Sequence, residues 1–149
     1  MDFNTEEEPA IDAREFVEEV DILPKIPQDF HAQMNSSKWK DRKEALDATL
    51  DVVKASIKIK DEGIGELLRA LAKRMTDANV MCVIAAANII GGIAKGVGQP
   101  FSKYKSIVMP PMIERFKERK ANVVEAISNG LDEVFATVSP DLFNHPIIC

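Results

Sequence analysis

Apolar residues recur at helical spacing along most of this 149-residue chain, and this pattern constrains the fold more than any other feature. One stripe falls at i, i+4, i+7 and i+11, the spacing of a single helix face: Leu46, Leu50, Val53 and Ile57. Similar stripes run through residues 64–75, 101–116 and 124–138. Strictly alternating β-branched runs are absent, and only 6% of the residues are aromatic. The chain is therefore predicted to be all-α, with an aliphatic core.

The predicted helices fall into pairs that repeat at a nearly constant interval. The second helix of each pair is expected to begin near residues 39, 79 and 122, so the starts lie 40 and 43 residues apart. A local echo supports this register, because Ala-Asn-Val occurs at 78–80 and again at 121–123. HEAT and armadillo units repeat every ~40–47 residues. The prediction is a HEAT-repeat-like α-solenoid with about three helical hairpins, preceded by an N-terminal helix over residues 12–23.

The distribution of charge divides the chain into regions. Residues 1–21 contain nine acidic side chains and one basic one, Arg14, whereas from Ile22 onward 18 basic residues outnumber 15 acidic ones. Residues 1–11 are predicted to be an acidic flexible leader, and residues 12–138 a partial repeat domain. Residues 139–149, which open with Ser139-Pro140, are expected to begin a further helix or to form a tail. The mildly basic repeats suit an acidic partner, either a protein or a nucleic acid.

Membrane insertion and disulfide chemistry are not expected from this sequence. The longest apolar stretch, residues 80–94, is interrupted by Asn88, Gly91 and Gly92, so no membrane-spanning helix is predicted. The two cysteines, Cys82 and Cys149, are too few for a disulfide framework. A reducing compartment, the cytosol or the nucleus, is therefore predicted.

No catalytic, metal or cofactor site can be assembled from the sequence. The two histidines, His31 and His145, lie in different segments, and neither has a cysteine or carboxylate at ligand spacing. Residues 91–96 (Gly-Gly-Ile-Ala-Lys-Gly) resemble a phosphate loop only superficially, because they lack the Gly-Lys-Ser/Thr ending and a preceding strand. We expect no cofactor and conclude that the chain is not an enzyme.

Trp39 is the only tryptophan and stands at the turn of the first predicted hairpin. Two interpretations are open. The side chain continues the Leu46 stripe and closes the end of the core, or it is an exposed anchor among cations such as Lys40 and Arg42. A large aromatic side chain surrounded by cations is typical of a hot spot on a protein-binding surface.

The turns of the other two hairpins are also polar. The second turn contains Asp77, Ala78 and Asn79, and the third contains Arg119, Lys120 and, one helix position later, Asn122. Each turn alone is typical of ordinary solvated capping. Stacked repeats place all three turns on one edge of the array, which favours a shared binding function.

Four of these segments resemble a known family. Residues 37–46 (Ser-Lys-Trp-Lys-Asp-Arg-Lys-Glu-Ala-Leu) are similar to the first-repeat signature of TOG domains in microtubule polymerases such as ch-TOG and mini spindles. Residues 20–30 resemble the lead-in of those domains, and residues 77–81 and 116–124 resemble their second and third turn motifs. The resemblance extends from about residue 12 to residue 138 and covers only the N-terminal half of such a domain.

The resemblance implies a tubulin-binding module of a microtubule-associated protein that acts in microtubule growth and spindle assembly. Its partner would be αβ-tubulin, on the β-tubulin side, and its location the cytoplasm, at microtubules and spindle poles or centrosomes. The contacts would be made by the three turns: Trp39, Lys40, Arg42, Asp77, Ala78, Asn79, Arg119, Lys120 and Asn122. We expect no nucleic-acid or membrane partner.

Two alternatives and one further expectation remain. A generic HEAT-repeat scaffold for a non-tubulin partner is the main alternative, and salt-dependent nucleic-acid binding is the second. A last repeat without a neighbour would leave apolar surface uncovered, so self-association or a marginally stable last hairpin is also expected.

Overall fold

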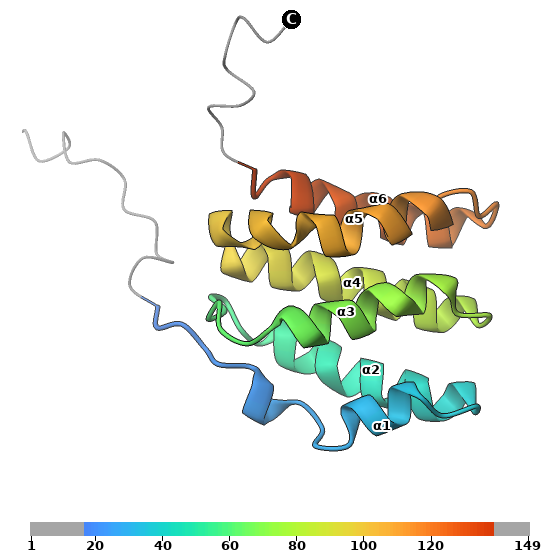
Figure 1. Ribbon diagram of the computed structural model, residues 1–149, viewed down its shortest axis with the longest axis horizontal. Coiled ribbons are helices and arrows are strands. Elements are labelled where there is room, and N and C mark those ends of the chain that lie inside the picture. The colour runs from blue at the N-terminus through green and yellow to red at the C-terminus, as the bar shows by residue number, and fades with distance from the viewer. Residues whose placement is uncertain (1–16, 139–149) are drawn as a thin grey trace, which may run out of the picture.

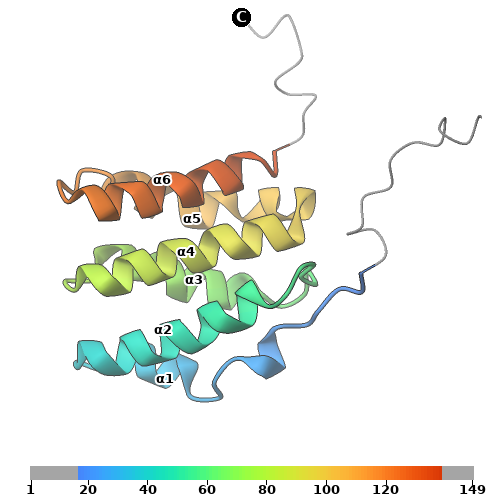
Figure 2. The same ribbon diagram turned by 180° about the vertical axis from the view of Figure 1, so that it is seen from behind.

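The computed structural model describes residues 17–138, and they form a stack of helical hairpins (Figure 1). The elements, in chain order, are η3 (Leu23–Lys25), α1 (Phe30–Met34), α2 (Trp39–Lys54), α3 (Gly65–Lys73), η4 (Arg74–Thr76), α4 (Val80–Val97), η5 (Gln99–Tyr104), α5 (Lys105–Arg115) and α6 (Ala121–Phe135). Helices α1–α2, α3–α4 and α5–α6 make three hairpins. As the reverse view shows, α2, α4 and α6 form one layer, and α1, α3 and α5 form the other (Figure 2). The predicted all-α HEAT-repeat solenoid is confirmed.

The predicted N-terminal helix over residues 12–23 is wrong where the structure describes it, from residue 17 onward. Here the backbone N–H of Val20 donates to the carbonyl of Lys58, and the N–H of Lys60 donates to the carbonyl of Val20, both at 2.8 Å. These bonds form an isolated parallel bridge between Val20 and Ile59. Because these bonds satisfy the backbone of Val20 without a helix, residues 17–22 form no helix, and Val20 pairs with the connection that follows α2. The expectations for residues 1–16 and 139–149 lie outside the described part of the chain.

Helix α4 is the central helix of the core. The side chain of Asn79 caps it by accepting a hydrogen bond from the N–H of Met81 at 2.9 Å, and Gly98, with φ of +80°, ends it. Contrary to the sequence expectation, Val80–Val97 is long and apolar enough to cross a membrane by length and composition alone. In the fold, however, 61% of that window is buried, between α2 and α6. Its apolar character is therefore that of a core helix covered on both sides.

Three of the predicted inward stripes include a residue that the structure leaves exposed: Ile57, Phe116 and Phe135. Leu46 and Val53 are buried, but α2 stops at Lys54, so Ile57 lies beyond the helix and is 58% exposed. On α6, Val134 is buried while the neighbouring Phe135 is exposed. All three residues lie at or just beyond the end of their helix, where the periodicity that the helix sets stops.

Helices α4 and α6 approach closely at two glycines. A Cβ added to Gly91 would lie 3.1 Å from the Cα of Gly130. A Cβ added to Gly130 would lie 3.0 Å from the carbonyl oxygen of Ala87 and 2.8 Å from the Cε of Met112. The second and third hairpins therefore pack backbone to backbone at this point, which fixes how the third turn sits beside the second.

Candidate protein-binding edge

The three turns inside the hairpins lie at one edge of the stack, on the right in Figure 1. They comprise residues 35–38 between α1 and α2, residues 74–79 between α3 and α4, and residues 116–120 between α5 and α6. We call these turns, with the first residues of α2, α4 and α6, the turn edge. The predicted site residues all belong to it.

Trp39 is the first residue of α2 and is 40% exposed. Its carbonyl accepts a hydrogen bond from the Cys82 thiol, with a sulfur-to-oxygen distance of 3.7 Å, so its backbone is held against α4. The interpretation of Trp39 as a buried end of the core is wrong. An amphipathic ring left partly in water at a turn is instead available to a partner.

A buried carboxylate joins the first turn to the second. The Arg42 guanidinium donates to Asp77 twice, from Nε to Oδ2 at 2.7 Å and from Nη2 to Oδ1 at 2.8 Å. Arg74 donates a further hydrogen bond to Oδ2 at 2.9 Å, and the N–H of Asn79 donates to Oδ1 at 2.8 Å. The side chain of Asp77 is 0% exposed. Because Arg42 also donates to the carbonyl of Ser36, this cluster fixes both turns together.

Electrostatics in this cluster favour a charged Asp77. Burial raises the pKa of the Asp77 carboxyl, but hydrogen bonds from Arg42 and from the Asn79 N–H, with the charges of Arg42 and Arg74, outweigh it. The net result is a pKa below the ordinary aspartate value. Asp77 therefore stays ionised at neutral pH and holds both guanidinium groups in place.

Arg115, at the end of α5, joins the third turn to the second. Its Nη1 donates to the carbonyl oxygens of Met75 and Asp77 at 2.7 and 3.0 Å, and its Nη2 donates to Glu118 at 3.3 Å. Glu118 in turn accepts from the N–H of Arg119 at 2.8 Å. Through Arg42, Asp77 and Arg115, one continuous set of hydrogen bonds connects all three turns. Five donors in a fixed fork suit arginine to this bridging role.

The predicted site residues divide into an exposed group and a supporting group. The exposed group contains Trp39, Lys40, Ala78, Arg119, Lys120 and Asn122. Asn79 is partly buried and serves as the cap of α4. The side chains of Arg42 and Asp77 are turned into the cluster, so they hold the turn edge in shape rather than form its outer surface.

Sequence reasoning missed four residues of this edge. Arg74 and Arg115 support the turns, and their role depends on contacts with Asp77 and Met75 that no local pattern reveals. Met81 and Phe116 are exposed at the second and third turns. Each turn therefore presents one large apolar side chain: Trp39, Met81 or Phe116. They occupy different positions of the repeat, because Trp39 and Met81 are the first and second residues of α2 and α4 whereas Phe116 follows α5, so no fixed repeat position in the sequence marked them.

The described residues offer no obvious place for a metal ion. Within residues 17–138, no group of three or more His, Cys, Asp or Glu side chains is arranged to hold one. What the turn edge does present is a row of apolar side chains among lysine and arginine residues. Such a surface is suited to binding a protein with complementary acidic groups.

Comparison with known proteins adds the family context. A family model of HEAT repeats, described as stalled ribosome sensor GCN1-like, matches residues 20–147. The chain is 48% identical over 138 residues to the spindle pole body component alp14 of Schizosaccharomyces pombe. It is 35% identical over 139 residues to the protein mini spindles of Drosophila melanogaster. These matches cover 92% and 93% of this chain but only 17% and 7% of those two proteins.

The solved structures show the same relationship. One neighbour is a structure of microtubule polymerases with tumor overexpressed gene (TOG) domain arrays, concerned with tubulin recruitment and assembly. It matches with a TM-score of 0.79 at 37% identity, over 88% of this chain and 27% of that one.

Proposed function

This chain belongs to the HEAT-repeat family and folds as part of a TOG domain, and on that premise we propose that it binds αβ-tubulin through the turn edge. The observation that carries the proposal is the exposed Trp39 beside Lys38 and Lys40, on an edge that three hydrogen-bonded turns hold in one shape. A binding function of this kind needs no catalytic group. It suits a protein that regulates microtubule growth and spindle assembly.

By analogy with TOG domains, we propose how the chain is oriented on tubulin. Trp39 meets β-tubulin, the second turn adds contacts from Ala78 and Asn79, and Arg119 and Lys120 face acidic tubulin surface. Arg42 and Asp77 act by positioning these groups. Met81 and Phe116 join the contact set, because they are exposed at the same edge. Rigid turns of this kind reduce the entropy lost on binding.

The location follows from the partner. We place this protein in the cytoplasm, on microtubules and at spindle poles or centrosomes. Its similarity to a spindle pole body component supports this location.

Titration of the fluorescently labelled chain with αβ-tubulin heterodimer, followed by anisotropy, tests the proposal. We expect saturable binding, and no comparable binding to duplex DNA. The nucleic-acid alternative instead predicts DNA binding whose affinity falls steeply with added salt. A generic HEAT-repeat scaffold predicts no binding of tubulin, and that result would refute the proposal.

We also propose weak self-association through the last hairpin. Ile113 on α5 and Phe135 on α6 are exposed apolar side chains of that hairpin. Sedimentation velocity over a range of concentrations is expected to show a dimer that Phe135→Glu disfavours. A sedimentation coefficient that does not change with concentration would exclude it.

A further inference from the structure

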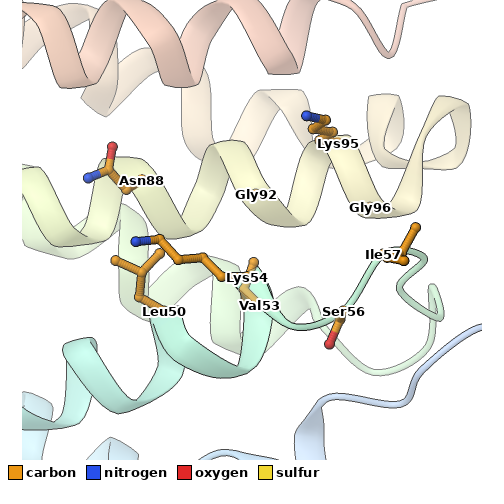
Figure 3. Close-up of a pocket in the computed structure, with 9 residues that line it drawn as sticks. All are labelled: Leu50, Val53, Lys54, Ser56, Ile57, Asn88, Gly92, Lys95 and Gly96. Atoms are coloured by element: carbon orange, nitrogen blue, oxygen red, sulfur yellow. The ribbon is translucent and has the colours of Figure 1, made fainter.

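A groove of about 500 Å³ lies between α2 and α4, away from the turn edge (Figure 3). Its lining contains Leu50, Val53, Lys54, Ser56, Ile57, Asn88, Gly92, Lys95 and Gly96. Figure 3 shows Lys54 and Leu50 on the α2 side, Asn88 and Lys95 on the α4 side, and Ile57 on the connection after α2.

The lining of the groove includes the apolar side chains of Leu50, Val53 and Ile57 beside the backbone of Gly92 and Gly96. A Cβ on Gly92 would lie 2.6 Å from Val53, and a Cβ on Gly96 would lie 2.6 Å from Ile59, so only glycine allows this packing. At one end stands Ile57, which at 58% is the most exposed large apolar side chain within residues 17–138. Covering such an exposed apolar surface with another apolar side chain is energetically favourable.

The rim adds charge and hydrogen-bonding capacity to this lining. Lys54 is an exposed residue of α2, the exposed Asn88 supplies an amide on α4, and Lys95 lies further along α4. Lys58 follows Ile57 immediately in sequence. The complementary ligand is an extended peptide with an apolar side chain flanked by carboxylates. The apolar side chain then contacts the apolar lining, and the carboxylates lie beside the lysine side chains of the rim.

The chain itself contains such a segment. Residues 6–16 hold five acidic side chains and one basic one, and they include the apolar Ile11 and Phe16. This segment is tethered near the groove, since Val20 is hydrogen-bonded to Lys58 and Lys60, on either side of Ile59. The nine peptide steps from Ile11 to Val20 span up to ~30 Å when extended, whereas residues 50–54 of α2 cover only ~6 Å at the rise of a helix.

We infer that the groove between α2 and α4 is a docking site for the acidic segment 6–16 of the same chain, with Ile11 or Phe16 against Ile57 and Leu50 and the carboxylates beside Lys54. A short tether gives the segment an effective concentration on the order of 1 mM, so weak contacts suffice for occupancy. The carboxylate–ammonium contacts make the docking sensitive to salt.

Methyl NMR of the complete chain tests this inference. The methyl signals of Leu50, Val53 and Ile57 are compared between the unaltered chain and a variant carrying Glu6→Lys, Glu7→Lys, Glu8→Lys and Glu15→Lys. We expect these signals to shift in the variant, and raised salt to produce the same shift in the unaltered chain. Nuclear Overhauser contacts from Ile11 or Phe16 to Ile57 are expected in the unaltered chain only. Lys54→Glu is expected to have the same effect as the fourfold reversal.

The control is Glu125→Lys, which reverses one exposed charge on α6 and is expected to leave the groove signals unchanged. The buried Ile127 serves as an internal reference for an intact core. Groove signals that do not respond to the fourfold reversal, with no contact from Ile11 or Phe16, would overturn the inference. Contacts that appear only between differently labelled molecules would also overturn it, because the occupant would then be a second copy.

Discussion

The Arg42 guanidinium donates hydrogen bonds to both oxygens of the Asp77 carboxylate, at 2.7 and 2.8 Å, although the two residues are 35 positions apart in the sequence. The pair connects two repeats at the edge where we place the binding surface. The carboxylate is inaccessible to solvent and the arginine nearly so. Breaking a buried ion pair is costly, because it leaves the remaining charge without compensation.

Asp77→Asn is therefore expected to lower the free energy of unfolding by about 3 kcal/mol. The amide keeps the shape of the carboxylate but removes the charge that Arg42 and Arg74 share. Urea denaturation followed by circular dichroism measures the change. The control is Asp47→Asn, which removes an exposed pair with Lys43 on α2 and is expected to cost about 0.5 kcal/mol or less. Equal effects of the two variants would show that the buried cluster does not stabilise the turns.

The same cluster predicts a dependence of stability on acidity. Because the folded-state pKa of Asp77 is lowered, its contribution to the free energy of unfolding is fully present above the unfolded-state pKa of about 3.9. It is lost as the pH falls through the folded-state pKa. The difference in unfolding free energy between the unaltered chain and Asp77→Asn should be constant above about pH 5 and shrink below about pH 4. A difference that does not narrow on acidification would contradict the lowered pKa.

The close approach of α4 and α6 predicts an unusual response to alanine. Gly130→Ala gains up to about 1 kcal/mol of helix propensity, but its Cβ meets the Ala87 carbonyl at 3.0 Å and Met112 at 2.8 Å. Overpacking of this kind costs about 1–3 kcal/mol, so we expect net destabilisation. Gly65→Ala on α3 is the matched control, because its Cβ has no neighbour closer than 3.5 Å and should be neutral or stabilising. The melting temperatures of the two variants, measured beside that of the unaltered chain, test this expectation.

The sequence was informative where structure depends on local periodicity. The Leu46 stripe located α2, and the interval between repeats located α4 and α6 within a residue or so of their observed starts. The chain around Trp39 left two interpretations open, and the 40% exposure of its side chain decides between them. The three hairpins were therefore predictable from the 3.6-residue spacing together with the interval between repeats.

Features that depend on distant contacts were not predictable. Residues 17–22 are apolar enough for a helix, but the backbone of Val20 hydrogen-bonds to Lys58 and Lys60 instead. Asp77 was expected at the surface, yet it is buried because Arg42 and Arg74 meet there. Phe116 was expected to face inward, but α5 ends at Arg115, which frees it from the stripe. For Val20 and Asp77 the deciding partner is distant in sequence, and for Phe116 the deciding factor is the point at which α5 ends.

The most direct test of the account is the tubulin affinity of Trp39→Ala, measured beside Phe135→Ala. The two aromatic side chains have similar exposure, 40% and 46%, but only Trp39 lies on the turn edge. Loss of a hot-spot aromatic costs about 2 kcal/mol or more, so Trp39→Ala should weaken tubulin binding roughly thirtyfold and leave the melting temperature nearly unchanged. Phe135→Ala should leave the affinity unchanged. A Trp39→Ala chain that melts far lower yet binds tubulin with unaltered affinity per folded molecule would contradict the turn edge as the binding surface.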